Sequence, residues 1–395
     1  MCSVCASPVV MCKSGHFAGY TVVYQARHAK LHDDTMRSSA VRHFSGRLLA
    51  TDYSTLSPRM FSSSKATTTA AAHLEASASS VMTSFADQAK RFFIFDQVEP
   101  DVFRTSDLVT FRHGSSRAAY GGLIFAQALA AAENTVDEKL KPHAMHSFFI
   151  LNVDISLPIE YHVRRVRDGR SFCTRTVEAV QQGKIAFTMQ VSFNVVEPDA
   201  AVHQDPMPTV PSWKELKSIK DLLPWLKTEI AEGRLKVQPV VEKRLKFYES
   251  QGNQNPGYLF EIRPLNVAHH LGIGSPNPSR TFHSWFKTRG NVDDCEKLQR
   301  YLVAYNTDAT MAGSAFRPHF VNDFRPSMLF SLDHSVWMHQ HEMRADQWML
   351  VENTSTVAGR GRAFTTGKVW SEDGRLLLSC TQEVVLRSRG DVSKI

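Results

Sequence analysis

The chain has 395 residues, which is long enough for two ordinary domains with a hydrophobic core each. Its hydrophobic content of 43% is typical of a globular protein. The sequence contains no run of about eighteen apolar residues, so we expect no membrane span. The net charge is +7, but eight basic and three acidic residues lie up to Lys65, so the rest of the chain is nearly balanced. This balance gives no support to nucleic-acid binding.

Residues 1–84 are not expected to join a folded core. They are rich in Ser, Thr, Ala and Arg, poor in acidic residues, and show no sustained hydrophobic period. The stretch 37–64, which includes the segment RMFSSS from Arg59, is typical of a mitochondrial presequence. The alternative is an upstream extension of a protein whose real start is Met60 or Met82.

The six cysteines show neither metal-site spacing nor a disulfide framework. Cys2 and Cys5 form a lone C-x-x-C pair, which without a second pair is weak support for zinc or redox chemistry. Cys173, Cys295 and Cys380 are scattered, as expected for free thiols in a reducing compartment. We therefore expect no metal ion and no cofactor.

The first ordered unit is predicted to span residues 85–197. Tyr120-Gly121-Gly122 opens an unbroken small and apolar run, 123–132, which predicts a helix buried on most sides. Strand-like runs follow, with glycine-containing turns between the later ones. They cover residues 145–152, 159–166, 171–180 and 185–195. The predicted outline is one central helix followed by a meander of antiparallel strands.

A polar, proline-punctuated linker is predicted over residues 198–257, with an amphipathic helix such as 213–225. The second unit, 258–390, begins with a strand at 284–286 and a helix at 294–311. Later strands are predicted at 328–338, 347–355, 362–371 and 376–387, and residues 391–395 form a tail. Both units therefore have the same order, and the predicted fold class is α+β, with an antiparallel sheet wrapped around each helix.

The two units also carry the same short motifs in the same order. HSFF at residues 146–149 is echoed by HSVW at 334–337, RSF at 170–172 by RAF at 362–364, and GKI at 183–185 by GRL at 374–376. The offsets lie between 188 and 192 residues, which fits one register with small loop insertions. A period of this length indicates a duplicated domain rather than a solenoid.

A carboxylate lies beside the core-facing stripe of the second helix. The stripe has apolar residues at spacings of three and four: Leu298, Tyr301, Leu302, Tyr305, Ala309 and Ala312. Asp308 falls at its edge, and a carboxylate in such a place needs a partner or a chemical role. The structural alternative is that Asp308 hydrogen-bonds the turn that follows.

The last strand places the amide of Gln382 on a face that is otherwise apolar. A buried amide is commonly a structural bridge, but an amide opposite a helical carboxylate can also hold a water molecule. With offsets near 190, Gln382 corresponds to about Val191, Ser331 to His143, and Asp308 to Ala130. The first copy thus lacks the acid, the hydroxyl and the amide together, which favours a single site in the second copy.

From residue 85 to 387 the chain resembles the TesB-type acyl-CoA thioesterase II family, whose members have a double hotdog fold. The resemblance rests on YGGLIFAQAL from Tyr120, HSFF, YLVAYNTD ending at Asp308, LDHSVW at 332–337 and TQE at 381–383. It implies tandem hotdog domains, with a non-catalytic first copy and a catalytic second copy. It also implies an acyl-CoA substrate, an internal pseudo-dimer, and association into homo-oligomers, as dimers or higher.

The resemblance also implies which residues act. The water-activating Asp, Thr and Gln of the family match Asp308, Ser331 and Gln382, with Ser in place of Thr. The implied reaction is direct attack of a held water on the thioester, with a backbone N–H near a helix start polarising the carbonyl. The chain has no G-x-S-x-G elbow that would predict a covalent acyl-enzyme.

Two further features are candidates of lesser specificity. Arg360-Gly361-Arg362 is a candidate phosphate contact, because two guanidinium groups flank a glycine that lets the backbone approach a ligand. The alternative is an ordinary solvated turn before a strand. His334 is interpreted as a satisfied core histidine rather than a catalyst.

Two other functions stay open. Hotdog folds also include enoyl-CoA hydratases with an Asp/His pair, but here no helical His lies about five residues from Asp308. The chain could alternatively be a catalytically weak acyl-CoA binding or regulatory protein, because Ser331 replaces Thr and the first copy has diverged. An acyl-CoA hydrolysis assay with free-thiol detection separates this protein from an enzyme.

The chain ends in Ser393-Lys394-Ile395, which is close to the Ser-Lys-Leu peroxisomal address. Related eukaryotic thioesterases are often peroxisomal, so the expected location is the peroxisomal matrix, with the import receptor as a partner. The mitochondrion is the alternative.

Overall fold

The protein is represented by a computed structural model that describes residues 84–108, 117–237, 239–250, 259–271, 279–322, 324 and 326–388. The predictions made for residues 1–83 and for the C-terminal tail, including the C-x-x-C pair and Ser393-Lys394-Ile395, lie outside these residues. Within the part that is described, no helix is long and apolar enough to span a bilayer.

The first half is built as the helix-then-meander order predicts. Its elements are α1 (Phe85–Lys90), η1 (Arg91–Phe93), β1 (Asp96–Glu99), β2 (Val102–Thr105), α2 (Gly121–Glu133), β3 (Leu140–Phe149), β4 (Ile159–Asp168), β5 (Phe172–Gln181) and β6 (Lys184–Val195). Every residue of α2 after Gly121 is buried, because the sheet covers it on one side and α6 on the other. The β1–β2 hairpin was not predicted.

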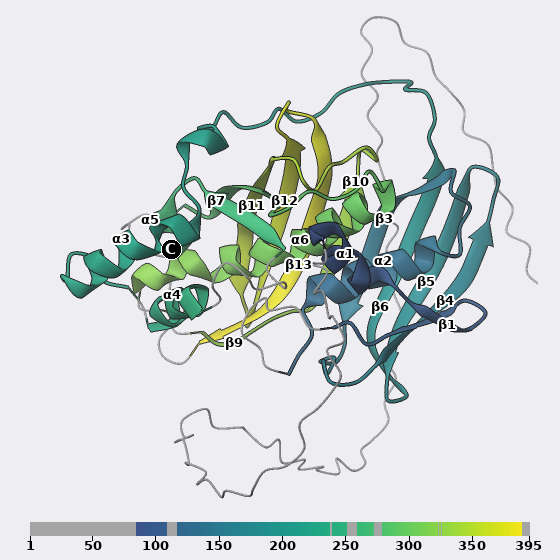
Figure 1. Ribbon diagram of the computed structural model, residues 1–395, viewed down its shortest axis with the longest axis horizontal. Helices are drawn as coiled ribbons and strands as arrows, with labels where there is room; N and C mark the ends of the chain where they lie inside the picture. Colours follow the sequence, from purple (N-terminus) through teal and green to yellow (C-terminus); the bar gives the residue numbers. More distant parts are fainter. Residues whose placement is uncertain are drawn as a thin grey trace, which may run out of the picture. The chain divides into compact units, whose positions relative to one another are not determined.

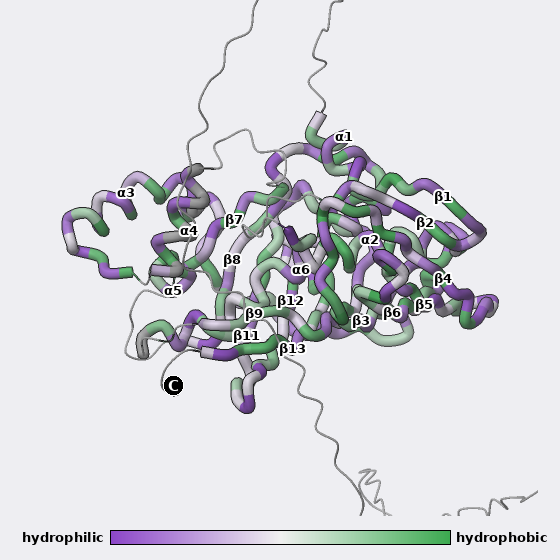
Figure 2. Tube along the Cα trace, turned by 90° about the horizontal axis from the view of Figure 1, so that it is seen from below, coloured by the Kyte–Doolittle hydropathy of each residue, from purple (hydrophilic) through white to green (hydrophobic). Residues whose placement is uncertain are grey.

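The second half repeats this order after a helical connector. The connector holds η2 (Trp213–Glu215), α3 (Ile219–Ala231) and α4 (Pro239–Ser250). The half itself holds β7 (Phe260–Pro264), α5 (Val267–Leu271), β8 (Thr281–Thr288), α6 (Glu296–Phe316), η3 (Arg317–Asn322), β9 (Pro326–Ser331), β10 (Asp333–Met338), β11 (Met349–Gly359), β12 (Arg362–Ser371) and β13 (Leu376–Ser388). Along β12 and β13 buried and less buried residues alternate, so that one face of the sheet is turned to the core. Figure 2 shows hydrophobic and hydrophilic residues interspersed along the chain.

All strands in the described part of the chain belong to one antiparallel sheet. Its order is β1-β2-β4-β5-β6-β3 in the first half and β10-β13-β12-β11-β8-β7 in the second, with β9 paired to β13. The second order is the first in reverse, so the halves are related as in a two-fold dimer. They join where β3 pairs with β10, His146 opposite Ser335 and Ser147 opposite His334. The repeated HS motifs meet at this junction, and the predicted tandem hotdog fold is confirmed.

The two central helices pack directly on each other. A Cβ at Gly122 would lie 2.4 Å from the carbonyl oxygen of Tyr305, so only glycine allows this approach. The hydroxyl of Tyr120 donates to the same carbonyl oxygen at 3.0 Å. The Gly-Gly sequence at the start of α2 is therefore explained by contact between the halves.

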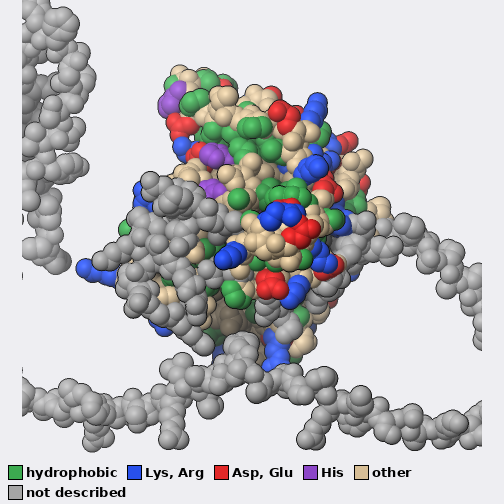
Figure 3. Space-filling model, turned by 90° about the vertical axis from the view of Figure 1, so that its left-hand side faces the viewer, with side chains coloured by type: hydrophobic (Ala, Val, Ile, Leu, Met, Phe, Trp, Pro, Cys, Tyr) green, Lys and Arg blue, Asp and Glu red, His purple; other side chains and the backbone are tan. Residues whose placement is uncertain are grey.

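The predicted helix 213–225 is wrong at its start. Ser218 and Asp221 form a capping box that begins α3 at Ile219, so Trp213 belongs to a separate turn. Trp213 stacks on Trp348 at 4.9 Å, and Trp285 donates to the carbonyl oxygen of Pro211 at 3.0 Å. The connector thus crosses the outer face of the second half's sheet. Figure 3 shows the side with the connector helices, where basic, acidic and hydrophobic side chains are intermixed.

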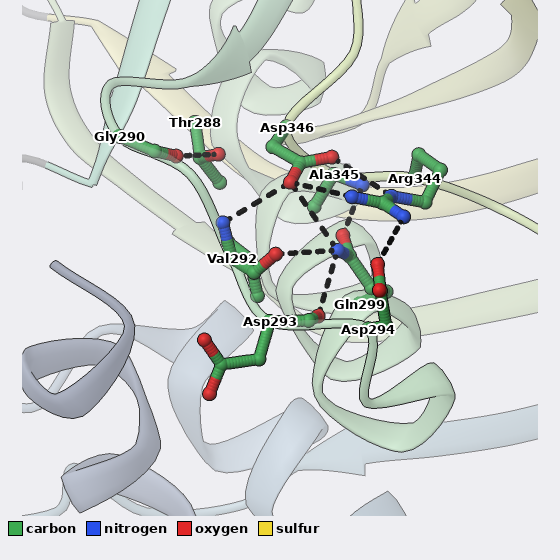
Figure 4. A network of polar contacts seen from close by, with 9 residues as sticks. All are labelled: Thr288, Gly290, Val292, Asp293, Asp294, Gln299, Arg344, Ala345 and Asp346. Carbon is green, nitrogen blue, oxygen red and sulfur yellow. Dashed lines mark hydrogen bonds and ion pairs between the residues drawn. The ribbon is translucent and has the colours of Figure 1, made fainter.

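A polar network fixes the entry of the chain into α6 (Figure 4). The side-chain oxygen of Gln299 accepts from the N–H of Ala345 at 2.7 Å. Asp346 accepts from the N–H of Val292 at 3.1 Å and from Arg344 at 3.0 Å. Because Gln299 lies in the first turn of α6, the network anchors this helix to the loop before β11.

Candidate active site

Asp308, Ser331 and Gln382 come together from α6, β9 and β13. Gln382 Nε2 donates to Asp308 Oδ1 at 2.5 Å, and Ser331 Oγ donates to the same oxygen in a longer contact of 3.4 Å. Gln382 is 0% exposed and Asp308 8% exposed, while Ser331 is half-buried. The structure therefore joins the three residues that the sequence singled out.

Strand register explains this convergence. Gln382 shares the buried face of β13 with Cys380 and Val384, and this face packs on α6. Ser331 pairs with Val384, two residues beyond Gln382 on the same face. The periodicity argument for Gln382 on an apolar face is confirmed by the burial of its neighbours.

The first half also reaches the site, which the sequence analysis did not foresee. A Cβ at Gly121 would lie 3.1 Å from Asp308 Oδ2 and 2.9 Å from the ring of Phe149. The carboxylate therefore sits at the N-terminus of α2, where the helix dipole favours negative charge. The signal in the sequence was Gly121 at a helix start, but its partner is 187 positions away in α6 and only the fold reveals it.

Two other groups near Asp308 are buried without being charged. His334 Nε2 lies 2.8 Å from Thr307 Oγ1, and burial lowers the pKa of His334, although the charge of Asp308 opposes this shift. Burial, with a smaller contribution from Asp308, raises the pKa of the Cys380 thiol to about 12. Neither residue adds a charge to the site near neutral pH. His334 is a buried core histidine, but the interpretation that it is satisfied holds only for Nε2, because Nδ1 has no hydrogen-bond partner among the described residues.

Gln382 has one hydrogen-bonding atom to spare. Its Oε1 is buried and has no hydrogen-bond partner within the described part of the chain. Because Nε2 already donates to Asp308, the orientation of the amide leaves Oε1 as an acceptor for an O–H group. A water molecule that donates to Gln382 and faces Asp308 would satisfy this atom.

Comparison with known proteins decides the family. Family models described as the N- and C-terminal domains of acyl-CoA thioesterase match residues 112–194 and 243–386. Acyl-coenzyme A thioesterase 8 of Rattus norvegicus is 35% identical over 293 residues, which cover 73% of this chain and 87% of that protein. The chain belongs to the TesB-type acyl-CoA thioesterase family. It is thus a thioester hydrolase by family, and the resemblance seen in the sequence is confirmed.

Other comparisons agree with this assignment. The acyl-CoA thioesterase II TesB2 of Mycobacterium marinum has a TM-score of 0.58 and 27% identity, and the match covers 76% of this chain and 98% of that structure. The peroxisomal acyl-coenzyme A thioester hydrolase 1 of Saccharomyces cerevisiae is 24% identical over 312 residues, which cover 70% of this chain and 88% of that protein.

Within this thioesterase the strand ladders also align the two copies. A β-bulge lies at the same place in β4 and β11, and it aligns Arg175 of β5 with Thr365 of β12. The ladder partner of Arg175 is Val191, and that of Thr365 is Gln382. Gln382 therefore corresponds to Val191, as the sequence offset indicated. The same register aligns Ser331 with Pro142, so its correspondence to His143 was wrong by one residue. The reason is that the two HS motifs are one residue out of step with the ladders, which pair His146 with Gln190 and Ser335 with the equivalent residue, Thr381.

The turn Arg360-Gly361-Arg362 joins β11 to β12. Both Arg360 and Gly361 have positive φ, 52° and 76°, as tight hairpins require, so the turn itself explains the glycine. Arg362 Nε donates to Glu383 Oε1 at 2.8 Å, and Arg362 pairs with Val385, three residues beyond Gln382. The turn thus lies at the same end of β13 as the site, but no described contact links it to Asp308.

Proposed function

We propose that the protein hydrolyses fatty acyl-CoA to a free fatty acid and CoA by direct attack of one water molecule. The observation that carries this proposal is the hydrogen bond from Gln382 to Asp308, made between a strand and a helix at the N-terminus of α2. Ser331 adds a hydroxyl on the same carboxylate oxygen. The arrangement supplies a proton acceptor, an orienting amide and a hydroxyl around one point.

In this mechanism Asp308 takes a proton from the water molecule while the water oxygen attacks the thioester carbonyl carbon. Gln382 and Ser331 orient the water and the carboxylate. The oxyanion that forms faces the start of α2, where a backbone N–H of Gly121 or Gly122 stabilises it. The intermediate then collapses by breaking the C–S bond, and the CoA sulfur leaves as thiolate and takes up a proton.

The variant D308N tests the assignment. It keeps the size of the side chain and removes the proton acceptor, so kcat should fall about 100-fold or more. The assay follows free thiol released from palmitoyl-CoA and from a series of other chain lengths, and circular dichroism checks the fold. Near-normal hydrolysis by folded D308N would reject the mechanism.

A second candidate is a catalytically weak acyl-CoA binding protein. It is favoured by the contact between Ser331 and Asp308, which at 3.4 Å is longer than a strong O–H···O bond. The same assay decides, because tight binding of acyl-CoA without thiol release by the wild-type protein would support this candidate. A hotdog enoyl-CoA hydratase is a further alternative. An assay that follows the addition of water to an enoyl-CoA tests for this activity.

The phosphates of CoA are proposed to contact the Arg360-Gly361-Arg362 turn. The support is the place of the turn at the Ser331 end of β13 and the exposure of both arginines. A phosphate there would compete with Glu383 for Arg362. The kinetic test of this contact is given below.

The proposed location is the peroxisomal matrix, reached through the import receptor that reads the C-terminal Ser393-Lys394-Ile395. The support is this tripeptide and the name of the yeast relative. Fluorescent fusions that mask either terminus test it, since import that survives a blocked C-terminus would favour the mitochondrial alternative.

Domain boundaries and assembly are proposed as the sequence indicated. The extension 1–84, the domains 85–197 and 258–390, the linker 198–257 and the tail 391–395 can be tested by limited proteolysis with mass spectrometry. Homo-oligomers, as dimers or higher, can be tested by light scattering. A single monomeric mass at micromolar concentration would contradict the proposed association.

A further inference from the structure

The contact between α2 and α6 has two ends, and only one carries the proposed site. Gly121 lies beside Asp308, whereas Glu133, at the last turn of α2, lies beside Arg300 near the start of α6. Residue numbers rise along α2 as they fall along α6, so the helices are antiparallel. The second end is about 18 Å further along α2.

Charged side chains fill this second end. Arg300 Nη2 donates to Glu133 Oε1 at 2.5 Å and Nη1 to Glu296 Oε1 at 2.8 Å, while Lys141 Nζ lies 3.0 Å from Glu296 Oε2. Arg300 is 0% exposed and Glu133 4% exposed. Glu133 and Lys141 belong to the first half and the other two to the second, so the network ties the halves together.

Stability alone does not explain a buried pair of this kind. Taking both charges out of water is costly, and an apolar pair of similar volume is often equally stable. Glu133 Oε2 and Arg300 Nε have no hydrogen-bond partner among the residues described, so the pair is not optimised. Burial lowers the pKa of Arg300, because it disfavours the charged form. Glu133 and Glu296 more than offset this effect, so the pKa lies above its ordinary value and Arg300 stays charged.

What an ion pair adds over an apolar contact is direction, because its hydrogen bonds fix where one helix lies along the other. We propose that Arg300 and Glu133 are positioning residues that set α2 against α6 and thereby the gap between the start of α2 and Asp308. That gap is narrow, since a Cβ at Gly121 would already lie 3.1 Å from Asp308 Oδ2. A displacement of about 1 Å in such a site can cost about 100-fold in rate.

The decisive variant is the double replacement E133M/R300M, which fills the space with flexible apolar side chains. R300M alone leaves Glu133 buried without its cation and should lower Tm most, and the double variant should recover most of that loss. The folded double variant should nevertheless show kcat reduced about tenfold or more, with KM changed less than about twofold. A double variant with wild-type Tm and wild-type kcat would overturn the proposal, because the pair would then be structural only.

Two single variants keep the test decisive if the double variant does not fold. R300K keeps the charge but not the planar fork that holds Glu133 and Glu296 together, so it should fold with kcat reduced about tenfold. E133Q keeps the shape and an acceptor for Arg300, so it should retain kcat within about twofold. Wild-type kcat in R300K would overturn the proposal, because the hydrogen-bond geometry of Arg300 would then not affect the rate.

The catalytic consequence rests on the proposed function, so a readout without substrate separates the two. Crystal structures of the wild-type protein and of R300K give the distance from Gly121 Cα to Asp308 Oδ2 directly. The proposal requires this distance to change, and an unchanged distance overturns it whatever the protein hydrolyses. Failure of the wild-type protein to release thiol would instead reject the proposed function and leave this measurement standing.

Discussion

The two halves share one topology but use the inner face of their sheets differently. Arg175 and Thr365 occupy the same ladder position, facing Val191 and Gln382. Arg175 is 1% exposed and donates to Thr135 at 2.8 Å and to Asp168 at 2.5 Å, so it ties β5 to the chain just after α2. Thr365 is short and binds only the backbone oxygen of Gln382, at 3.2 Å, among the described contacts. At this position the first copy thus has a long structural side chain, and the second has a short one that leaves space for the amide of Gln382.

The largest expected effect comes from giving the second half the residue of the first. Q382V removes the amide that holds Asp308, so kcat should fall about 100-fold while the apolar neighbours still pack. Thiol release and thermal melting measure the two effects. The reciprocal variant V191Q should gain no activity and lose about 1–3 kcal/mol of unfolding free energy, because its amide is buried unpaired. Full activity in Q382V would break the comparison.

The structural role of Arg175 gives the next prediction. R175T installs the residue of the second half and leaves a cavity beside Thr135, so the unfolding free energy should fall by about 2–4 kcal/mol. Urea denaturation measures this loss, and kcat of the folded fraction should stay near wild type. A large loss of kcat at full stability would show that the first half acts in the chemistry through this position.

Ser331 should have a smaller effect than Asp308 or Gln382. S331A removes the hydroxyl that donates to Asp308 Oδ1 at 3.4 Å, and kcat should fall about tenfold. S331T restores the residue type of the family and should be at least as active as the wild-type protein. If S331A hydrolyses acyl-CoA at the wild-type rate, the hydroxyl is not part of the machinery.

Thiol reactivity tests the difference between buried and exposed cysteines. Burial raises the pKa of Cys173, and that of Cys380 to about 12, whereas Cys295 is exposed. Since the thiolate is the reactive form, Cys295 should react with a disulfide reagent at pH 8, whereas Cys173 and Cys380 should react only after unfolding. Mass spectrometry of labelled peptides assigns each site. Fast labelling of Cys380 in the native protein would contradict its placement behind Asp308.

The smallest expected change concerns the Arg360-Gly361-Arg362 turn. R360A/R362A should raise KM for acyl-CoA about threefold to tenfold and leave kcat nearly constant, because each lost phosphate contact weakens ground-state and transition-state binding alike. R167A/R170A, on the hairpin of the first half, is the matched control and should change neither constant. An unchanged KM in R360A/R362A would show that the turn is a structural hairpin without a phosphate contact.

The sequence predicted the features that depend on local pattern. The central helices, most of the later strands, Asp308 and Gln382 followed from periodicity and from the repeated motifs. The run 328–338, predicted as one strand, is two strands, β9 and β10. The helix start at Ile219 was missed because a capping box outweighs the apolar pattern before it. Gly121 beside Asp308, and Glu133 beside Arg300, could not be predicted, because each pair joins the two halves and depends on how α2 crosses α6.

The central claim is that Asp308 and Gln382 hold the attacking water. The most direct measurement is a crystal structure with an acyl-CoA analogue in which a methylene group replaces the thioester sulfur and the carbonyl remains. The account predicts a water within hydrogen-bond distance of Asp308 and Gln382 Oε1, about 3–3.5 Å from the carbonyl carbon, with the carbonyl oxygen facing the start of α2. A carbonyl bound away from Asp308, or no room for water between them, would contradict the account.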